Sequence, residues 1–254
     1  MAKIAVCYKW VKDEADVRVN ADLSVDLSRA KYKTSDYDKN TIEAACRAAA
    51  AIGAQTVGIS CGGAETRKSF SDALARGLGE GIWINSGDAE LSGASVGRLL
   101  KAVIERTDDI SLVLCSEGSS DEYARQTGPR LGALLDWPVI SSAAAFSVEG
   151  NTITAERKLE NCVQTVKAEL PAVISVLPEA APAPIPGLKQ VMMAKKKPVK
   201  EYSLEELGAD MNGGLADKGM RGYVSQRKNE IISGDSDEQT IALLVEALTK
   251  DGVI

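Results

Sequence analysis

The residues of this chain that could do chemistry follow three predicted strands, and their types suit a phosphate-bearing ligand. The longest such segment, residues 116–129, combines small residues, hydroxyl side chains and a predicted helix start whose free amides attract phosphate. Arg125 adds positive charge to it. Shorter segments, residues 7–11 and 61–63, follow two other strands. The pattern points to an adenine nucleotide with its phosphate near residues 125–127.

Each of these segments also has an ordinary structural interpretation. Glycine and serine after a strand usually serve as turn residues, and residues 61–63 suit a tight packing turn. Neither a Walker A motif nor a GxGxxG fingerprint is present, so NTPase and direct NAD-binding predictions lack support. The acidic pair Asp108 and Asp109 and the lysine run 195–197 are typical of solvated surface, although the prolines near the lysines make a partner contact conceivable.

Composition excludes several classes of function. The 254 residues contain no histidine, which excludes imidazole-based catalysis, including serine and cysteine triads and most zinc hydrolase sites. The net charge of −6 argues against a nucleic-acid binder, and no apolar run approaches the roughly 20 residues of a membrane span. The start reads as a strand rather than a signal peptide. Five scattered cysteines without a CxxC pair favour reduced thiols, so we expect a soluble, cytoplasmic protein.

The elements that must position these residues alternate along the first two-thirds of the chain, as in a parallel sheet covered by helices. We expect strands at residues 3–8, 55–60, 81–85, 110–115 and 171–176, and helices at residues 38–52, 66–76, 92–106 and 124–135. Ligands of open parallel sheets bind beyond the carboxyl ends of the strands, where the strand order reverses. The segments that follow these strands are therefore the candidates for a binding site.

The last third of the chain has a different character. Antiparallel strands are expected at residues 143–149, 152–159 and 162–169, with a turn at Gly150. Five prolines and three consecutive lysines indicate an extended excursion over residues 178–198. Residues 208–235 are rich in glycine and charge and predict an exposed tail, and residues 236–250 predict an amphipathic helix.

Together these segments resemble the β subunit of electron transfer flavoproteins over nearly the whole chain. Residues 5–11 look like that family's first strand and lysine-containing turn, and residues 60–62 match its SCG turn. Residues 37–45 are similar to its first helix start, although Ser35 and Asp36 replace the usual Asn-Pro. Residues 121–128 match its acidic stretch leading into the Q-T-G segment.

The most specific part of the resemblance is the hairpin signature of residues 155–160 with Gln164 and Val166, followed by the Pro-Ala-Val strand. The sequence departs from that signature at residues 161–162, where acidic or glycine residues are normal. Residues 185–198 resemble the family's recognition loop. The details look closest to the Fix-type branch, found with acyl-CoA or carnitine-type reductases and with nitrogen fixation.

The resemblance implies an α/β fold: a doubly wound, mostly parallel sheet with helices on both faces, like the adenine nucleotide alpha hydrolases. A small antiparallel hairpin region and an extended C-terminal arm ending in a helix complete it. We expect a nucleotide-binding domain at residues 1–177, a recognition loop at 178–200, and a C-terminal arm at 201–254 that packs on the α subunit.

The family resemblance also implies a function. The α subunit of such a heterodimer holds most of a redox-active FAD, and the β subunit carries either a structural AMP or, in electron-bifurcating members, a second FAD that accepts hydride from NADH. We expect an electron carrier rather than a stand-alone enzyme, with NADH oxidoreductase activity only if it bifurcates. Its redox partner would be an acyl-CoA-type dehydrogenase or reductase. A universal-stress-type adenine nucleotide sensor is the remaining alternative, but it explains neither the hairpin signature nor the recognition loop.

Carried over position by position, the resemblance assigns a nucleotide site and a partner surface. The nucleotide site comprises Cys7, Ser35, Asp36, Tyr37, Asp38, Cys61, Ser116, Glu117, Gly118, Ser119, Ser120, Asp121, Glu122, Tyr123, Ala124, Arg125, Gln126 and Thr127. The backbone amides of the last three residues would hold the phosphate. The partner-binding residues would be Ile185, Pro186 and Leu188, with Ile185 as an apolar anchor in a pocket of the dehydrogenase.

Overall fold

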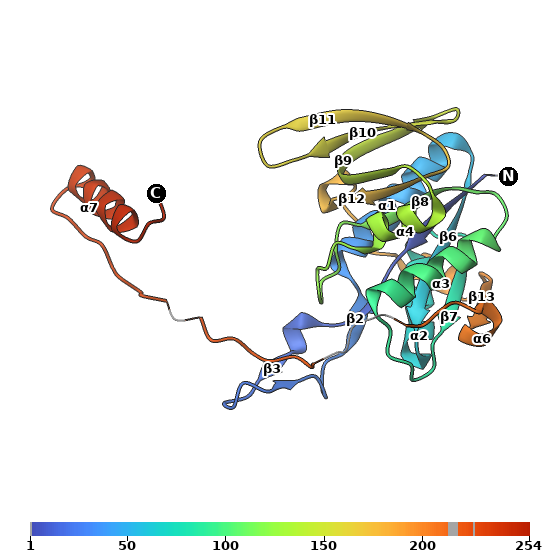
Figure 1. Ribbon diagram of the computed structural model, residues 1–254, viewed down its shortest axis with the longest axis horizontal. Coiled ribbons are helices and arrows are strands. Elements are labelled where there is room, and N and C mark those ends of the chain that lie inside the picture. Colours follow the sequence, from blue (N-terminus) through green and yellow to red (C-terminus); the bar gives the residue numbers. More distant parts are fainter. Residues whose placement is uncertain (1, 213–217, 226) are drawn as a thin grey trace. The chain divides into compact units, whose positions relative to one another are not determined.

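The computed structural model describes residues 2–212, 218–225 and 227–254 (Figure 1). The chain falls into two compact units. The first consists of residues 1–18 and 25–219, and the second of residues 19–24 and 220–254. The candidate residues from Cys7 to Leu188 all belong to the first unit.

The first unit is built on a nine-stranded sheet. From one edge to the other its strands are β11 (Val163–Glu169), β10 (Thr152–Lys158), β9 (Val139–Glu149), β12 (Ala172–Val176), β8 (Ile110–Ser116), β1 (Lys3–Cys7), β6 (Gln55–Gly62), β7 (Glu80–Asn85) and β13 (Val199–Ser203). From β9 to β13 every neighbouring pair runs parallel. Only the hairpin strands β10 and β11 are antiparallel to their neighbours. This arrangement confirms the predicted mostly parallel sheet with a hairpin extension.

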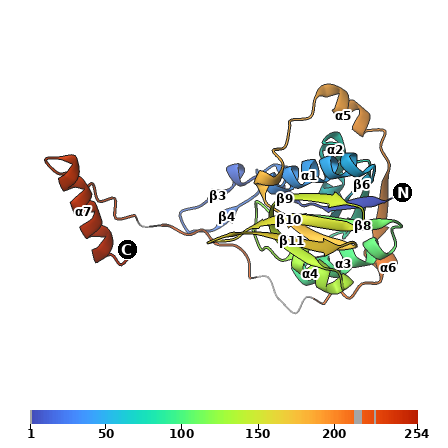
Figure 2. The ribbon, with the colours of Figure 1, turned by 90° about the horizontal axis from the view of Figure 1, so that it is seen from above.

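Helices cover both faces of this sheet (Figure 2). On one face lie α1 (Asp36–Ile52) and α2 (Ala64–Ala75), and on the other lie α3 (Gly93–Glu105) and α4 (Thr127–Leu135). The alternation of side chains along β1 explains the two cores. Ile4 and Val6 pack into the cluster that contains α1 and α2 residues, whereas Ala5 and Cys7 join the cluster that contains α3 and α4 residues.

The strand order reverses between β1 and β8. From β1 the chain proceeds through β6 and β7 on one side, and then returns to β8 on the opposite side of β1. The two strands pair in parallel with Cys7 opposite Cys115, so their carboxyl ends lie side by side. In open α/β sheets this point forms a crevice in which ligands bind.

Most predicted elements agree with the structure within two residues, and two starts need correction. Helix α1 begins at Asp36 rather than residue 38, with Ser35 as its N-cap. Helix α4 begins at Thr127 rather than residue 124. The reason is that Tyr123 and Arg125 have positive φ angles of 48° and 56°, which a right-handed helix cannot accommodate. Residues 118–126 are therefore a loop.

Other differences concern strands. Strand β6 continues to Gly62, so residues 61–62 are paired with β7 instead of forming a turn. Strand β9 begins at Val139 rather than residue 143, because its first part pairs in parallel with β12 before the hairpin starts. The sequence also gave no indication of β13, whose exposed, charge-rich residues add an edge strand beside β7.

The prediction of an extended excursion over residues 178–198 is wrong for its centre. A short helix, α5 (Leu188–Ala194), begins after Gly187, and the 3₁₀ turn η2 (Pro178–Ala180) precedes it. The remaining short elements are β2 (Trp10–Lys12) paired with β5 (Tyr32–Thr34), β3 (Arg18–Val19), β4 (Val25–Asp26), the turn η1 (Glu14–Asp16) and α6 (Leu204–Leu207).

The second unit ends in the predicted amphipathic helix, α7 (Asp237–Lys250). It is capped by the Ser236 hydroxyl, which accepts from the Gln239 amide, and none of its residues is buried. The predicted tail of residues 208–235 is mostly exposed where it is described, and residues 213–217 and 226 lie outside the described chain. None of the described helices is long and apolar enough to cross a membrane.

Candidate functional site

Asp38 joins the two strand ends at the reversal point. It is the third residue of α1, and its side chain reaches the end of both β1 and β8. The Asp38 Oδ2 accepts from the backbone amide of Lys9 at 2.8 Å, and Oδ1 lies 2.5 Å from Ser116 Oγ. Asp38 is only 2% exposed. Burial raises the pKa of its carboxyl to about 7, although the bonds from Ser116 and Lys9 favour the charged form.

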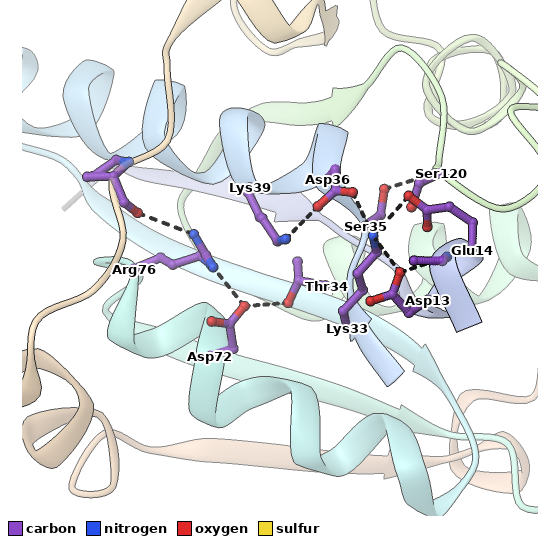
Figure 3. Close-up of polar contacts among 12 residues, drawn as sticks. Asp13, Glu14, Lys33, Thr34, Ser35, Asp36, Lys39, Asp72, Arg76 and Ser120 are labelled. Carbon is purple, nitrogen blue, oxygen red and sulfur yellow. Dashed lines mark hydrogen bonds and ion pairs between the residues drawn. The ribbon is translucent and has the colours of Figure 1, made fainter. Parts of the chain in front are cut away.

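Ser35 connects the start of α1 to the loop after β8. Its buried Oγ accepts from the Ser120 amide at 3.2 Å, a contact visible in Figure 3. The hydroxyl of Ser120 is itself buried and has no hydrogen-bond partner among the described residues. A buried hydroxyl without a partner is uncommon in proteins, because its desolvation is not compensated. It is therefore available to a ligand of the loop.

Aromatic rings pack against this loop. The Tyr123 ring lies so close over Gly118 that any larger residue there would collide with it. The rings of Tyr37 and Tyr123 have centroids 5.1 Å apart at an angle of 42°. The guanidinium of Arg125 lies 4.6 Å from the Tyr123 ring centroid. The loop and the start of α1 therefore bring two aromatic rings and one cation together.

The acidic residues of the loop are paired with Lys9. The Lys9 ammonium lies 2.7 Å from Asp121 Oδ2 and 3.5 Å from Glu122 Oε2. Asp121 also accepts from the Ser119 hydroxyl at 2.5 Å. Burial alone would raise the pKa of Asp121, but the bonds from Lys9 and Ser119 hold it below its ordinary value. Lys9 thus offsets negative charge that would otherwise repel an anionic ligand.

Glu117 is tied to the antiparallel extension. Its carboxylate accepts from the Ser142 amide at 3.1 Å and lies 3.9 Å from the Arg125 guanidinium. Ser142 occurs where the register between β9 and β12 shifts, and its φ is 57°. The neighbouring Ser141 accepts from Arg157 through both its carbonyl, at 2.8 Å, and its hydroxyl, at 3.1 Å. The hairpin arginine therefore supports the loop indirectly.

Among the described residues, none is recorded as bonding the amides of Thr127 and Gly128 at the start of α4. Gln126, the N-cap, supplies no side-chain hydrogen bond to them, because its Oε1 accepts from Arg130 at 2.7 Å instead. Thr127 is exposed, and Gly128 packs so tightly that a methyl group there would collide with the Ser175 hydroxyl. Free amides at a helix start attract anions.

Asp36, Cys7 and Cys61 make their contacts outside the loop of residues 116–127. Asp36 pairs with Lys33 at 2.7 Å and Lys39 at 2.5 Å (Figure 3). The Cys7 side chain is buried in the α3 and α4 core, and Cys61 lies at the end of β6, on the far side of β1 from β8. Burial raises the pKa of the Cys61 thiol to about 12, so this thiol is neutral near pH 7. Ala124 is exposed on the loop.

The predicted partner residues form a separate exposed apolar surface. Ile185 is 93% exposed and Leu188 is 78% exposed, while Pro186 is half-buried. Arg76, the C-cap of α2, donates to the Pro184 carbonyl at 3.4 Å and to Asp72, which also accepts from Thr34 (Figure 3). This chain of contacts anchors the loop at the residue before Ile185.

A family model, described as the electron transfer flavoprotein domain, matches residues 22–207. The chain belongs to the electron transfer flavoprotein family. The match includes α1, the loop after β8, the hairpin and the exposed surface around Ile185. The family is flavin-associated, and its members take part in electron transport.

Within this flavoprotein fold, the structure adds three sets of contacts that the sequence did not predict. Lys9 neutralises the acidic loop, Ser142 holds Glu117, and Arg76 anchors the segment before Ile185. A lysine in the turn after the first strand was visible, but its partners lie more than 100 residues away. No local pattern marks the other two.

Proposed function

We propose that this chain is the β-type subunit of a heterodimeric, Fix-type electron transfer flavoprotein, and that it holds an adenine nucleotide at the reversal point of the sheet. The observation that carries the proposal is the loop of residues 116–127, which joins the end of β8 to the free amides of α4. The match to the family supports its role in electron transfer.

The residues present fit a nucleotide. The backbone amides of residues 125–127 and the guanidinium of Arg125 suit phosphate, and the buried Ser120 hydroxyl has no hydrogen-bond partner among the described residues. The rings of Tyr37 and Tyr123 suit a planar base or ring system. Lys9 limits the repulsion from the acidic residues of the loop.

FAD, held mainly by the partner subunit, would supply the redox chemistry of the heterodimer. The side chains of this chain would bind and orient. The surface around Ile185 would dock on an acyl-CoA-type dehydrogenase or reductase, because an exposed apolar anchor next to lysines is suited to a transient interface.

A second FAD in place of AMP is the alternative, which would make the chain a bifurcating subunit that accepts hydride from NADH. The proline after Gln126-Thr127-Gly128 is typical of that loop, whereas Tyr123 and Arg125 replace the small and acidic residues common there. Family membership favours both flavoprotein interpretations over a nucleotide sensor of the universal-stress type.

Denaturing the purified complex and counting the released nucleotides tests the proposal. We expect one FAD and one AMP per heterodimer. Two FAD and no AMP would replace the AMP proposal with the bifurcating one. Nucleotide release without any FAD, from a chain that purifies without a partner, would contradict the electron transfer function.

A further inference from the structure

The Ser116 hydroxyl lies between two acceptors when Asp38 is ionised. Ser116 Oγ lies 2.5 Å from Asp38 Oδ1 and 2.8 Å from the carbonyl oxygen of Gly118, and both are acceptors. A serine hydroxyl has a single hydrogen to donate. With Asp38 ionised, Ser116 would have to share its one hydrogen between both acceptors, whereas two full hydrogen bonds form if Asp38 carries a proton and donates it to Ser116 Oγ. The Ser116 hydroxyl is then free to hold Gly118.

Ionisation of Asp38 would change this arrangement. The carboxylate would take the Ser116 hydrogen, since a charged acceptor competes better than a neutral carbonyl. Within the described chain no other donor bonds the Gly118 carbonyl. The Gly118–Ser119 peptide would therefore lose its attachment. This peptide begins the segment that leads to Ser120, whose amide is held by Ser35.

The surroundings of Asp38 favour the protonated form. Its side chain is almost completely buried, and burial penalises a charge. The groups that face it are the Lys9 amide and ammonium from the turn after β1, the Ser35 hydroxyl of its own helix, Ser116 and the Cys115 thiol from β8, and the Tyr8 phenol after β1. Only Lys9 carries an opposite charge, and that charge is shared with Asp121 and Glu122.

We propose that Asp38 is a positioning residue that keeps the loop of residues 116–120 in its nucleotide-binding arrangement only while it carries a proton. This inference rests on the proposed nucleotide site. It assigns Asp38 no contact with the ligand. Its effect passes through Ser116 to the Gly118 peptide.

Ionisation of Asp38 should weaken the binding of AMP. Deprotonation releases Gly118 and adds a negative charge to the site proposed for an anionic ligand, and both effects weaken binding. The affinity of the wild type for AMP relative to Asp38→Asn should therefore be constant below about pH 7 and fall by up to about tenfold per pH unit above it. By the same linkage, binding above pH 7 should take up one proton.

The test measures AMP affinity of the full-length chain, stripped of nucleotide, by calorimetry from pH 6 to pH 9. Asp38→Asn presents an amide that can donate to Ser116 as the protonated acid does, so the pH profile of its affinity should show only the titration of AMP itself. Glu43→Gln, which removes a carboxylate paired with Arg47 further along α1, is the matched control and should keep the wild-type fall. Dividing the wild-type affinity by that of Asp38→Asn at each pH removes the titration of AMP itself.

Hydrogen exchange of the peptide covering residues 117–122 gives a readout without ligand. In the wild type, protection relative to Asp38→Asn should drop above about pH 7. Ser116→Ala lacks the hydroxyl that bonds the Gly118 carbonyl, so it should show low protection at every pH. If Asp38→Asn does not fold, the wild type is compared with Ser116→Ala alone.

The outcomes separate the two proposals. If Asp38→Asn loses affinity and protection with pH as the wild type does, or if Ser116→Ala keeps the wild-type step, the positioning role is overturned. If no variant binds AMP but the protection step still depends on Asp38, the AMP site fails and the positioning role stands.

Discussion

Thr127 lies where the proposed phosphate would meet the chain. It is exposed at the first position of α4, so a larger side chain there does not disturb the core. Its neighbours on the loop supply charged and hydroxyl side chains. The backbone amides at the helix start have fixed directions, so they define where the phosphate would lie. A single carboxylate at this position is therefore a sensitive probe of the phosphate.

We expect Thr127→Glu to reduce nucleotide binding at least about tenfold, the equivalent of about 1.4 kcal/mol, because it brings a negative charge to the phosphate position. The measurement is the amount of nucleotide released per chain on denaturation. Ala133→Glu adds the same charge at an exposed position later in α4 and should retain the nucleotide. Equal nucleotide content in both variants would contradict the phosphate position.

Helix α4 is positioned by its contact with the sheet. Gly128 allows the first turn of the helix to touch Ser175 on β12, and Gly132 makes a similarly close approach to Val139. The direction of the free amides thus depends on packing between an element and its neighbouring strand, rather than on the loop residues alone.

Replacing Gly128 by alanine should destabilise the protein by about 1 to 3 kcal/mol, because the new methyl group collides with the Ser175 hydroxyl. Thermal or denaturant unfolding measures this loss. Removing the hydroxyl in the double variant Gly128→Ala/Ser175→Ala should restore most of the stability, since the remaining Ser175 contact, to its Cβ at 3.5 Å, is an ordinary one. If the stability losses of the two single variants simply add in the double variant, the collision with the Ser175 hydroxyl is not the cause of the loss.

The segment before α5 is an element whose position depends on Arg76 and whose exposed residue does the proposed docking. Ile185→Asp should slow electron delivery to the dehydrogenase at least about tenfold, because a buried apolar anchor contributes about 1.5 to 3 kcal/mol to an interface. Stopped-flow reduction by the dehydrogenase measures this rate.

Flavin content should stay unchanged in Ile185→Asp, and Ile185→Leu should keep the wild-type rate. Loss of flavin from the aspartate variant would instead show that the segment is structural.

For the molecule as a whole, the second unit is incomplete by itself. Helix α7 has an apolar stripe formed by Ile241, Leu244, Val245 and Leu248, and the helix buries none of it. A helix of 14 residues is marginal in water without such burial. This supports the proposed role of the C-terminal arm in packing on the α subunit.

Leu244→Asp should weaken heterodimer formation by about tenfold to a hundredfold, because it removes one buried leucine side chain from the proposed interface. Leu243→Asp, on the opposite side of the helix, should have a smaller effect. Size-exclusion chromatography of the mixed subunits over a dilution series gives the dissociation constants. Indistinguishable constants for the two variants would contradict docking through this stripe.

Local patterns determined much of this protein in advance. The alternation of apolar residues along β1 and the periodicity of α1 predicted a helix-covered parallel sheet, because burial of one face imposes a period on neighbouring residues. The small and hydroxyl residues after β8 identified the candidate loop, because a strand end and a helix start are also local features of the sequence. Family resemblance then suggested Asp38 and Ile185, which no local pattern selects.

Long-range packing decided the rest. That β8 rather than β7 lies beside β1, that Lys9 meets Asp121, and that Arg157 supports Glu117 through the β9 backbone depend on pairing between strands distant in sequence. Tyr123 and Arg125 have positive φ angles, so α4 begins only at Thr127. These contacts, rather than the helix propensity of the loop residues, determine the loop conformation. Asp38 is buried, and shares Ser116 with the Gly118 carbonyl, only because the turn after β1, the start of α1 and the loop after β8 meet around its carboxyl group.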